Sequence, residues 1–385
     1  VGVRSSVLLP FHNLGMVIID EEHETSFKQA EPAPRYHARN VALVMARMAG
    51  ARTLLGTATP SLETYSNAVA GKYGYVSLTT RYGNVCMPEI EVVDIAELKR
   101  KKLMNGPFSP VLLREIRQAL ERKEQVILFQ NRRGFAPVVE CHVCGWTPQC
   151  PHCDVSLTFH KRSNSLTCHY CGFSTSVAQR CPQCDADRLS SKGYGTERIE
   201  DVLASIFPDA RVARMDLDTT RSRSAYEGII KGFQRGDTDI LIGTQMVTKG
   251  LDFRRVSVVG ILNASTMLNQ PDFRSYERAY QMMTQVAGRA GRSSAGNGQN
   301  VRPGRVILQV HDAKQPTVMQ VVRGDFEGMF RTQMEERRLF MYPPLCRLVY
   351  VYIKHKDEIV LEHLAEELAA LLRQVFGHRV LGPDM

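Results

Sequence analysis

The sequence contains no run of about 18 or more consecutive apolar residues, the length that a transmembrane helix needs. It also has no charged segment followed by a hydrophobic stretch at its start, which argues against an export signal. We therefore expect a cytoplasmic protein that has no membrane partner. Because thiols stay reduced in that compartment, the ten cysteines are expected to bind metal rather than to form disulfides.

A second absence is the phosphate-binding pattern G-x-x-x-x-G-K-[ST]. Without the loop that this pattern forms, we expect the chain to bind nucleoside triphosphates poorly and to hydrolyse them negligibly. The sequence begins at Val1 rather than at Met, and it ends at Met385 without an obvious terminal helix or tail. We therefore expect it to be an internal piece of a longer protein.

The composition is that of a globular protein, because 43% hydrophobic and 23% charged residues are close to average usage. This excludes wholesale disorder and a fibrous architecture. With 385 residues the chain is long enough for two or three domains, each with its own apolar core. The formal net charge of +9 favours a polyanionic partner only weakly, since a basic surface is about as common without one.

Two short apolar runs near the start of the chain each end in polar residues. Residues 16–19 lead into DEEH at 20–23, and residues 51–55 lead into GTATP at 56–60. Between them, residues 36–48 carry apolar side chains at helical spacing. This strand, helix, strand alternation predicts an α/β nucleotide-binding domain, in which ligands bind beyond the carboxyl ends of parallel strands.

A linker rich in glycine, proline and basic residues leads into a second region with the same alternation. Helices are predicted there at 111–122, 197–205 and 273–287, and strands at 125–129, 211–215, 240–242, 256–262 and 304–309. Residues 141 to about 190 interrupt the alternation with cysteines and turn residues. After residue 338 the pattern changes, and a strand at 348–353 with an amphipathic helix at 359–375 predicts a small α+β tail domain.

Eight of the ten cysteines form four C-x-x-C pairs. These are Cys141/Cys144, Cys150/Cys153, Cys168/Cys171 and Cys181/Cys184. Each such turn presents two sulfurs on one side of a tight loop, so four turns predict two structural Zn²⁺ sites with four thiolates each. A closed site of this kind leaves no open position for water, and we expect it to organise structure rather than to catalyse.

The spacing favours one of two ways to pair the turns. The fourteen residues between Cys153 and Cys168 are close to zinc-ribbon spacing, with residues 157–160 and 165–167 able to form the hairpin. We therefore expect the inner two pairs to share one ion and the outer two the other. Sequential pairing, first with second and third with fourth, is the alternative. We further expect three histidines inside the turns to point outward and two lone cysteines to be small buried apolar residues: His142, His152, His169, Cys86 and Cys346.

The polar strings at the strand ends suit nucleotide chemistry. At the end of a buried strand, one carboxylate can hold the Mg²⁺ of a nucleotide and the next can polarise an attacking water. Further along, QVAGRAGR at 285–292 places Arg289 and Arg292 three residues apart on one helical face. Such arginines can reach a γ-phosphate across a cleft and neutralise developing charge. An ordinary helix surface is the competing explanation for the arginine pair taken alone.

Taken in order, these strings resemble the motifs of the superfamily 2 helicases. GVRSS at 2–6 looks like a DNA-contact motif, DEEH like motif II, GTATP like motif III and FQNRRGF at 129–135 like motif IV. GYGTE at 193–197, GTQMVTKGLDF at 243–253 and QVAGRAGR look like the motifs that follow. The eight-cysteine insert between FQNRRGF and GYGTE resembles that of the primosomal protein N′ (PriA) family of helicases, and the resemblance spans nearly the whole chain.

The resemblance implies an α/β fold with two RecA-like helicase lobes, a Cys-rich double-zinc insertion in the second lobe and a small α+β C-terminal domain. The first lobe would occupy residues 1–95 and the second would begin at 96–140. The zinc module would follow at 141–190, the rest of the second lobe at 191–311 and the C-terminal domain at 312–385. In that family the phosphate-binding loop lies upstream of GVRSS, so an N-terminal truncation explains its absence here.

The resemblance also implies roles for particular residues. Asp20 and Glu21 would bind Mg²⁺ and activate water, and His23 would couple them to the DNA side. Three more residues would act at the phosphates, and two would meet the nucleotide across the cleft: Gln285, Arg289 and Arg292, then Gly250 and Asp252. Aromatic rings can stack on bases while basic side chains meet phosphates. The implied DNA contacts are Arg4, Phe27, Lys28, Arg35, Tyr36, Thr244, Gln245 and Lys249.

The activity implied is that of a 3′ to 5′ DNA helicase that uses ATP and Mg²⁺, recognises stalled or repaired replication forks and restarts replication by primosome assembly. Its partners would be forked and single-stranded DNA, primosome and helicase-loading proteins, and the single-stranded-DNA-binding protein. The alternative from another class is a zinc-ribbon nucleic-acid-binding scaffold with degenerate motor lobes. A third reading, an RNA helicase of the DEAH type, is disfavoured by the cysteine insert.

Overall fold

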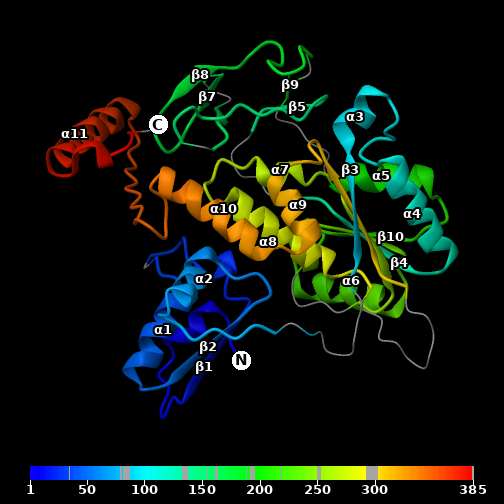
Figure 1. Ribbon diagram of the computed structural model, residues 1–385, viewed down its shortest axis with the longest axis horizontal. Coiled ribbons are helices and arrows are strands. Elements are labelled where there is room, and N and C mark those ends of the chain that lie inside the picture. Colours follow the sequence, from blue (N-terminus) through cyan, green and yellow to red (C-terminus); the bar gives the residue numbers. More distant parts are fainter. Residues whose placement is uncertain are drawn as a thin grey trace. The chain divides into compact units, whose positions relative to one another are not determined.

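The computed structural model describes residues 1–33, 35–78, 80, 87–131, 138–153, 155–160, 164–187, 189–190, 196–216, 218–248, 253–291 and 302–383. The chain divides into two compact units, Val1–Ser77 and Leu78–Met385, and each is described by itself (Figure 1). None of the described helices is both long enough and apolar enough to cross a membrane.

The first unit is built on two parallel strands joined through a helix. Its elements are η1 (Arg4–Leu8), β1 (Met16–Asp20), η2 (Thr25–Phe27), α1 (Ala38–Met48), β2 (Arg52–Gly56) and α2 (Leu62–Val69). Strands β1 and β2 pair in a register that sets Asp20 opposite Gly56. Ala38, Ala42 and Ala46 recur every four residues and form the buried face of α1. The predicted strand, helix, strand order is therefore found.

The second unit contains a parallel sheet, the helices that cover it and the cysteine-rich module. The strands of the sheet are β3 (Glu89–Asp94), β4 (Gln125–Phe129), β10 (Val212–Met215), β11 (Ile240–Gly243), β12 (Val256–Ile261) and β13 (Arg305–Val310). The helices are α3 (Ile95–Arg100), α4 (Pro110–Glu121), α5 (Thr196–Ile206), α6 (Arg223–Arg235), η4 (Gln245–Thr248), α7 (Ser265–Leu268), α8 (Ser275–Ala287), α9 (Pro316–Arg323), α10 (Phe326–Leu339), α11 (Glu358–Phe376) and η5 (Gly377–Arg379).

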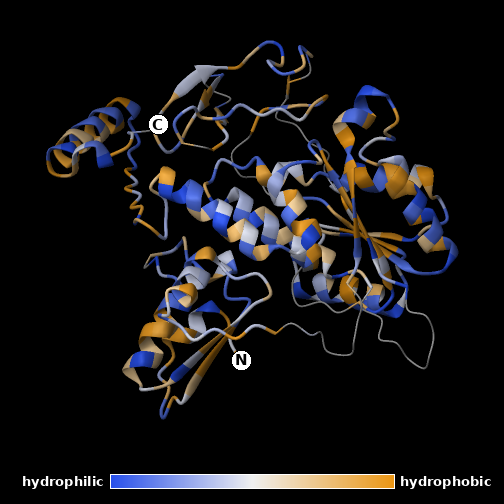
Figure 2. Ribbon diagram, in the orientation of Figure 1, coloured by the Kyte–Doolittle hydropathy of each residue, from blue (hydrophilic) through white to orange (hydrophobic). Residues whose placement is uncertain are grey.

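Among the described residues the sheet has the strand order β10-β11-β4-β12-β13-β3, and all neighbouring strands run parallel. Val126 and Leu128 of β4 point into a core that α4 and α5 supply, whereas the alternate residue Ile127 is equally buried on the other face. Helix α8 packs against β12 (Figure 1). Because both faces are covered, the inner strands β4 and β11 are almost entirely apolar, and the sheet is largely orange in Figure 2.

Helix α4 begins with a local signal that could be read from the sequence. The hydroxyl of Ser109 accepts a hydrogen bond from the amide of Leu112 at 3.2 Å, and Pro110 occupies the first helical position, where its missing N–H costs nothing. The apolar residues Leu112 and Ile116 then follow one turn apart and are fully buried. The predicted helix at 111–122 thus matches an observed element whose ends differ by one residue.

Strand β3 corrects the expected end of the first lobe. We placed that end at residue 95, but β3 pairs along its length with β13 in the second unit, and the division falls between Ser77 and Leu78. The guanidinium of Arg305 bridges Glu89 and Glu91 at 2.6 Å each, which stabilises the pairing. The edge position of β3 is set by a partner about two hundred residues away, so local pattern alone did not assign it.

The C-terminal segment also differs from the expectation. Helices α9 and α10 pack against α8 and so extend the second lobe instead of opening a new domain. The predicted helix at 359–375 is found as α11. The predicted strand at 348–353 is irregular, and its apolar side chains Val349 and Val351 are exposed. Among the described residues no strand lies beside this segment to complete a sheet.

The cysteine-rich module is made of two small antiparallel sheets. Strand β5 (Glu140–Cys141) pairs with β9 (Leu189–Ser190) and closes the base of the module. Strands β6 (Thr158–His160), β7 (Ser165–Thr167) and β8 (Ser174–Ser176) form a meander above it. The hairpin of β6 and β7 is the one that the sequence predicts between the inner cysteine pairs.

Candidate metal centres and nucleotide-site residues

The cysteines lie in tight turns with a common hydrogen-bond pattern. The amide of Gly145 donates to the carbonyl of Cys141 at 2.8 Å, and the amide of Cys141 donates to the carbonyl of Trp146 at 2.8 Å. The turns that begin at Cys168 and Cys181 repeat both bonds. Gly145 has a φ of 78°, a left-handed conformation that glycine adopts without strain. This backbone folds the chain back so that both sulfurs of a turn point to the same side.

The turns meet in two clusters of four sulfurs. Within each cluster, all four sulfurs lie within 4.8 Å of one another. The outer cluster is Cys141, Cys144, Cys181 and Cys184, and the inner cluster is Cys150, Cys153, Cys168 and Cys171. Sulfurs of facing turns are 3.6 Å apart in both clusters. Two sulfurs bound at about 2.3 Å to one tetrahedral zinc lie roughly 3.8 Å apart, whereas a disulfide is about 2.05 Å long. The clusters therefore fit zinc, and their membership is the one that the spacing favours.

The electrostatics of the clusters favour a bound cation. Burial, and after it the neighbouring thiols, raises the pKa of Cys153 above its usual range. Burial likewise raises the pKa of Cys168, to about 12, and the thiol of Cys150 adds to this shift. Four buried thiolates would repel one another without a compensating charge. A divalent ion reverses this balance, because a coordinating thiol is deprotonated outright.

The inner cluster contacts the second lobe through an aromatic stack. Tyr170 lies inside the turn between Cys168 and Cys171, and its ring contacts Phe273 and Tyr342 edge to face at 6.2 and 5.6 Å. Phe273 and Tyr342 stack on each other at 4.7 Å, and the hydroxyl of Tyr342 donates to the carbonyl of Cys153 at 2.9 Å. Phe273 directly precedes α8, so the inner knuckle packs against the start of that helix.

The outer cluster contacts the end of strand β13. His311 follows β13, and its ring lies 3.2 Å from the carboxylate of Glu140 and 2.9 Å from the ammonium of Lys99. Burial, and after it Lys99, lowers the pKa of His311 to about 3, so its ring stays neutral. A Cβ atom added at Gly145 would lie 2.2 Å from the His311 ring. Glycine is thus required there for space as well as for its positive φ.

In the first unit, the DEEH string leaves the carboxyl end of β1 and joins the GTATP string at the end of β2. His23 Nδ1 lies 2.7 Å from the hydroxyl of Thr57, and the Thr57 hydroxyl also accepts the amide of Thr59 at 3.0 Å. Oxygen Oε2 of Glu21 is buried and accepts no hydrogen bond from any described residue. Asp20 is exposed at the strand end. Asp20 is therefore open to water or a bound cation, whereas the buried oxygen of Glu21 lies 3.6 Å from Nδ1 of His23.

The residue that our sequence reasoning missed is Glu22. Its carboxylate is fully buried and accepts hydrogen bonds from Arg39 at 2.5 Å, from the amide of Ser61 at 2.7 Å and from the hydroxyl of Thr64 at 2.8 Å. It thereby ties the DEEH string to the start of α2, directly after GTATP. An arginine on the buried alanine face of α1 is the one sequence signal that could have indicated a buried acidic partner.

The predicted DNA contacts of the first unit gather on one loop. The guanidinium of Arg4 donates to the carbonyls of Ser26 and Lys28 at 3.3 and 3.2 Å. The amide of Gln29 donates to the carbonyl of Tyr36 at 2.8 Å, which closes the loop into a hairpin-like shape. Lys28 and Arg35 are exposed on it, and Phe27 and Tyr36 are half-buried. The structure therefore brings all five predicted residues together, although their role is not tested by this.

A half-buried histidine that follows this loop makes the stability of the first unit depend on pH. Burial, and then the charges of Arg39 and Lys28, lowers the pKa of His37 from 6.5 to about 4. Because the folded state disfavours the protonated ring, its contribution to stability is complete above pH 6.5 and is lost as the pH falls from about 6.5 to about 4. We expect the thermal midpoint to fall over that window and His37→Gln to reduce the fall. The control is His378→Gln at an exposed histidine, for which the thermal midpoint is expected to fall as in the unaltered chain. If both substitutions had the same effect, the acid dependence could not be assigned to His37.

In the second unit, the predicted motor residues lie at the ends of their elements. Thr244 and Gln245 follow β11 at the carboxyl edge of the sheet, where Thr244 is buried. Gln285 is in the last turn of α8, and Arg289 follows the helix and is largely buried. The turn beyond Arg289 depends on Gly291, whose φ is 70° and where a Cβ would lie 2.6 Å from the backbone of Gly304. Five residues for which the sequence made predictions fall outside the described part of the chain: Cys86, Lys249, Gly250, Asp252 and Arg292.

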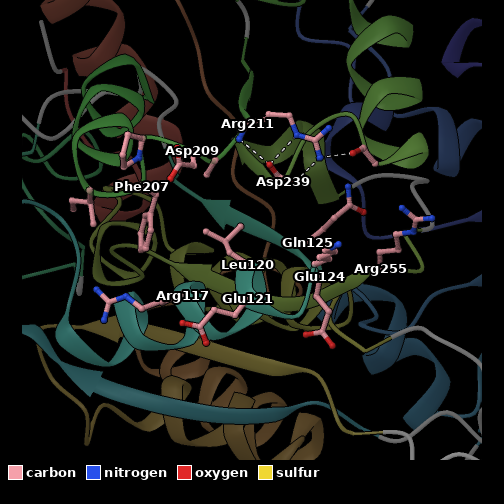
Figure 3. A pocket seen from close by; sticks show the side chains of 15 residues that line it. Arg117, Leu120, Glu121, Glu124, Gln125, Phe207, Asp209, Arg211, Asp239 and Arg255 are labelled. Carbon is pink, nitrogen blue, oxygen red and sulfur yellow. Dashed lines mark hydrogen bonds and ion pairs between the residues drawn. The ribbon is translucent and has the colours of Figure 1, made fainter.

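A large cavity in this unit lies away from these residues. It has a volume of about 630 Å³ and opens at the amino ends of the strands, beside Gln125 and Arg255 (Figure 3). Arg211 on its wall is held by Asp239, with a shortest distance of 2.6 Å, and by the carbonyl of Gly236 at 2.7 Å. Ligands of parallel sheets bind at the opposite, carboxyl edge. We therefore do not assign this cavity to the predicted site.

Comparison with known proteins finds similarity both in parts of the chain and over its whole length. The model of the PriA DNA helicase Cys-rich region matches residues 150–175, and that of the helicase conserved C-terminal domain matches residues 194–294. The replication restart protein PriA of Bacillus subtilis is 42% identical over 100% of this chain and 47% of its own length. That of Haemophilus influenzae is 38% identical over 100% of this chain and 51% of its own length. The chain belongs to the PriA family.

Within the PriA family, the chain spans about half the length of the curated relatives that it matches. The matched Cys-rich region contains the inner cluster, and the matched helicase domain contains Thr244, Gln245, Gln285 and Arg289. Among solved structures, S. cerevisiae Dbp5 bound to RNA and ADP BeF3 is 13% identical with a TM-score of 0.42, over 87% of this chain and 66% of that one. This likeness is too low to carry an argument about function.

Proposed function

We propose that this PriA-family chain is the motor part of an ATP-driven 3′ to 5′ DNA helicase that recognises stalled or repaired replication forks and restarts replication by primosome assembly. The observation that carries the proposal is that hydrogen bonds of His23 and Glu22 join the DEEH string after β1 to the residues that follow β2. Asp20 remains exposed, and one oxygen of Glu21 lies 3.6 Å from Nδ1 of His23. The similarity to curated PriA proteins supports the same function.

In this proposal each group has a chemical role that its surroundings allow. Mg²⁺ bound with ATP would supply positive charge at the phosphates. Asp20 would hold that ion, and the carboxylate of Glu21, whose side chain is 46% exposed, would accept the proton of the attacking water. Arg289 and Arg292 neutralise charge on the transferred phosphoryl group, and three further residues contact the nucleotide: Gln285, Gly250 and Asp252.

The proposed DNA contacts combine stacking with phosphate binding. Phe27 and Tyr36 stack on bases while Arg4, Lys28 and Arg35 contact the backbone. At the edge of the second sheet, Thr244, Gln245 and Lys249 border the strand. The two sulfur clusters each hold one structural zinc ion. Primosome and helicase-loading proteins and the single-stranded-DNA-binding protein are the proposed protein partners.

The test is the ATPase activity of Glu21→Gln. The assay needs a phosphate-binding loop, which these 385 residues lack, so it uses a chain extended to the full length of the relatives. Forked DNA is expected to stimulate hydrolysis, and Glu21→Gln is expected to reduce the stimulated rate at least about 100-fold, because a general base contributes roughly 10²–10⁴. DNA affinity is expected to stay unchanged, which separates loss of catalysis from loss of binding.

The matched control is Glu24→Gln, since Glu24 lies just beyond the DEEH string and has no proposed catalytic role. It is expected to retain the stimulated rate within about twofold, well inside the loss expected for Glu21. If the unaltered protein hydrolysed no ATP with or without DNA, the zinc-ribbon scaffold would instead be favoured. Stronger stimulation by RNA than by DNA would favour the RNA helicase.

A further inference from the structure

A second cavity, of about 280 Å³, lies at the carboxyl edge of the sheet in the second unit. Asn131 lines it from the end of β4 and Gln245 from the end of β11, two adjacent parallel strands. Met267 and Gln270 line it from α7 and the loop that follows. The inner zinc knuckle supplies a further wall through His169, which lies between Cys168 and Cys171. The cavity is therefore formed jointly by the lobe and the module.

The lining is mostly apolar and carries three amide side chains and one ion pair. Asn131, Gln245 and Gln270 supply the amides, while Met267 and Met282 supply apolar surface. The amide of Gln270 donates to the carbonyl of Thr266 at 2.6 Å. The one guanidinium on the wall, that of Arg278, is already bound to the carboxylate of Asp272 at 2.5 Å. An anion entering the cavity would have to compete with that carboxylate. These groups therefore suit an uncharged ligand with hydrogen-bonding edges better than a phosphate.

The size of the cavity restricts the ligand further. The volume lies just below the range of about 300–1,000 Å³ typical of small-molecule sites, which suits one ring system. Methionine and histidine side chains can cover the flat face of such a ring.

We propose that this cavity receives one unpaired base of the single DNA strand, with His169 of the zinc module against the base and Gln270 at its hydrogen-bonding edge. The proposal rests on the proposed function, because it requires that a DNA strand follows the carboxyl edge past Gln245. Under this proposal the inner zinc site has a second role, because the metal folds the knuckle whose His169 forms one wall of the base pocket.

The test compares two strands on the zinc-loaded chain at one fixed salt concentration. One is an oligothymidylate of about 12 nucleotides, and the other has the same backbone without bases. His169→Ala and Gln270→Leu are each expected to weaken binding of the oligothymidylate about tenfold, since base stacking contributes roughly 1–3 kcal/mol per base. Neither is expected to change binding of the abasic strand by more than about twofold.

Each variant has a matched control in the same chain. His142 occupies the same position in the outer knuckle as His169 in the inner one, and Gln118 is an exposed glutamine on α4. His142→Ala and Gln118→Leu are expected to bind both strands like the unaltered chain. Zinc content is measured for all four variants to show that the module remains folded.

A separate measurement does not depend on how the variants fold. A strand that carries 5-iodouracil is photocrosslinked to the unaltered chain, and the crosslinked peptides are expected to include His169 or Met267. Crosslinks only elsewhere, an equal loss on both strands, or no loss at all would overturn the base pocket while leaving DNA binding intact. Failure of the unaltered chain to bind either strand would overturn both the pocket and the proposed DNA binding.

Discussion

Replacing Cys168 with serine is expected to release the inner zinc ion and to unfold the meander of β6, β7 and β8. Structural zinc sites contribute about 10–16 kcal/mol of binding free energy in finger peptides, more than a module of this size can replace by packing. The unaltered chain is expected to contain about two zinc ions and the variant about one, measured by mass spectrometry of the metal. The matched control is Cys346→Ser, at a cysteine outside both clusters, which is expected to keep two.

The same measurement distinguishes the two ways of pairing the turns. In the structure Cys153 and Cys168 belong to one cluster, so the double variant Cys153→Ser/Cys168→Ser is expected to keep the outer ion. Under sequential pairing these two cysteines would serve different ions, and the double variant would lose both. A zinc content near zero in the double variant, with the chain otherwise folded, would contradict the observed clusters.

Replacing Arg337 with methionine is expected to destabilise the second unit by about 3–5 kcal/mol. Arg337 of α10 is 1% exposed, and its guanidinium donates to the carboxylate of Glu277 on α8, itself 4% exposed, at 2.6 Å. It also donates to the carbonyl of Pro343 at 3.0 Å and lies over the ring of Phe273 at 5.2 Å. Without Arg337 the buried carboxylate of Glu277 loses the guanidinium that compensates its charge, which is the costly outcome.

Urea unfolding followed by the fluorescence of Trp146, the one tryptophan in the sequence, measures this loss. The exposed neighbour provides the control, because Arg338→Met is expected to change stability by no more than about 0.5 kcal/mol. Adding Glu277→Gln to Arg337→Met is expected to recover part of the loss, since it removes the buried charge. Equal unfolding curves for the variants at 337 and 338 would contradict the importance of the buried pair.

The elements that could be predicted from the sequence are those with a local signal. Strand β4 is a continuous apolar run, α4 has a cap and a periodic face, and the cysteine spacing indicates which turns share a cluster. Each of these signals acts over a few residues. Arg4 and the loop from Phe27 to Tyr36 were each expected to contact DNA, but the contact between them was not predicted and is seen only in the structure.

What could not be predicted depends on partners far along the chain. The edge strand β3 exists because β13 lies beside it, and the segment at 348–353 is irregular although its composition is typical of a strand. The buried role of Glu22 depends on three groups that different elements deliver to one point. Such assignments follow from tertiary packing, which overrides local preference in short segments.

Helix α8 connects the zinc module to the segment that carries Arg289. It begins beside Phe273, which stacks against the zinc knuckle, and Arg289 follows its last residue. Thirteen residues of α-helix form a stiff rod about 20 Å long. A small tilt at the end near the zinc module would therefore move Arg289 at the far end, so a purely structural metal would help to position a side chain that we propose acts on the nucleotide.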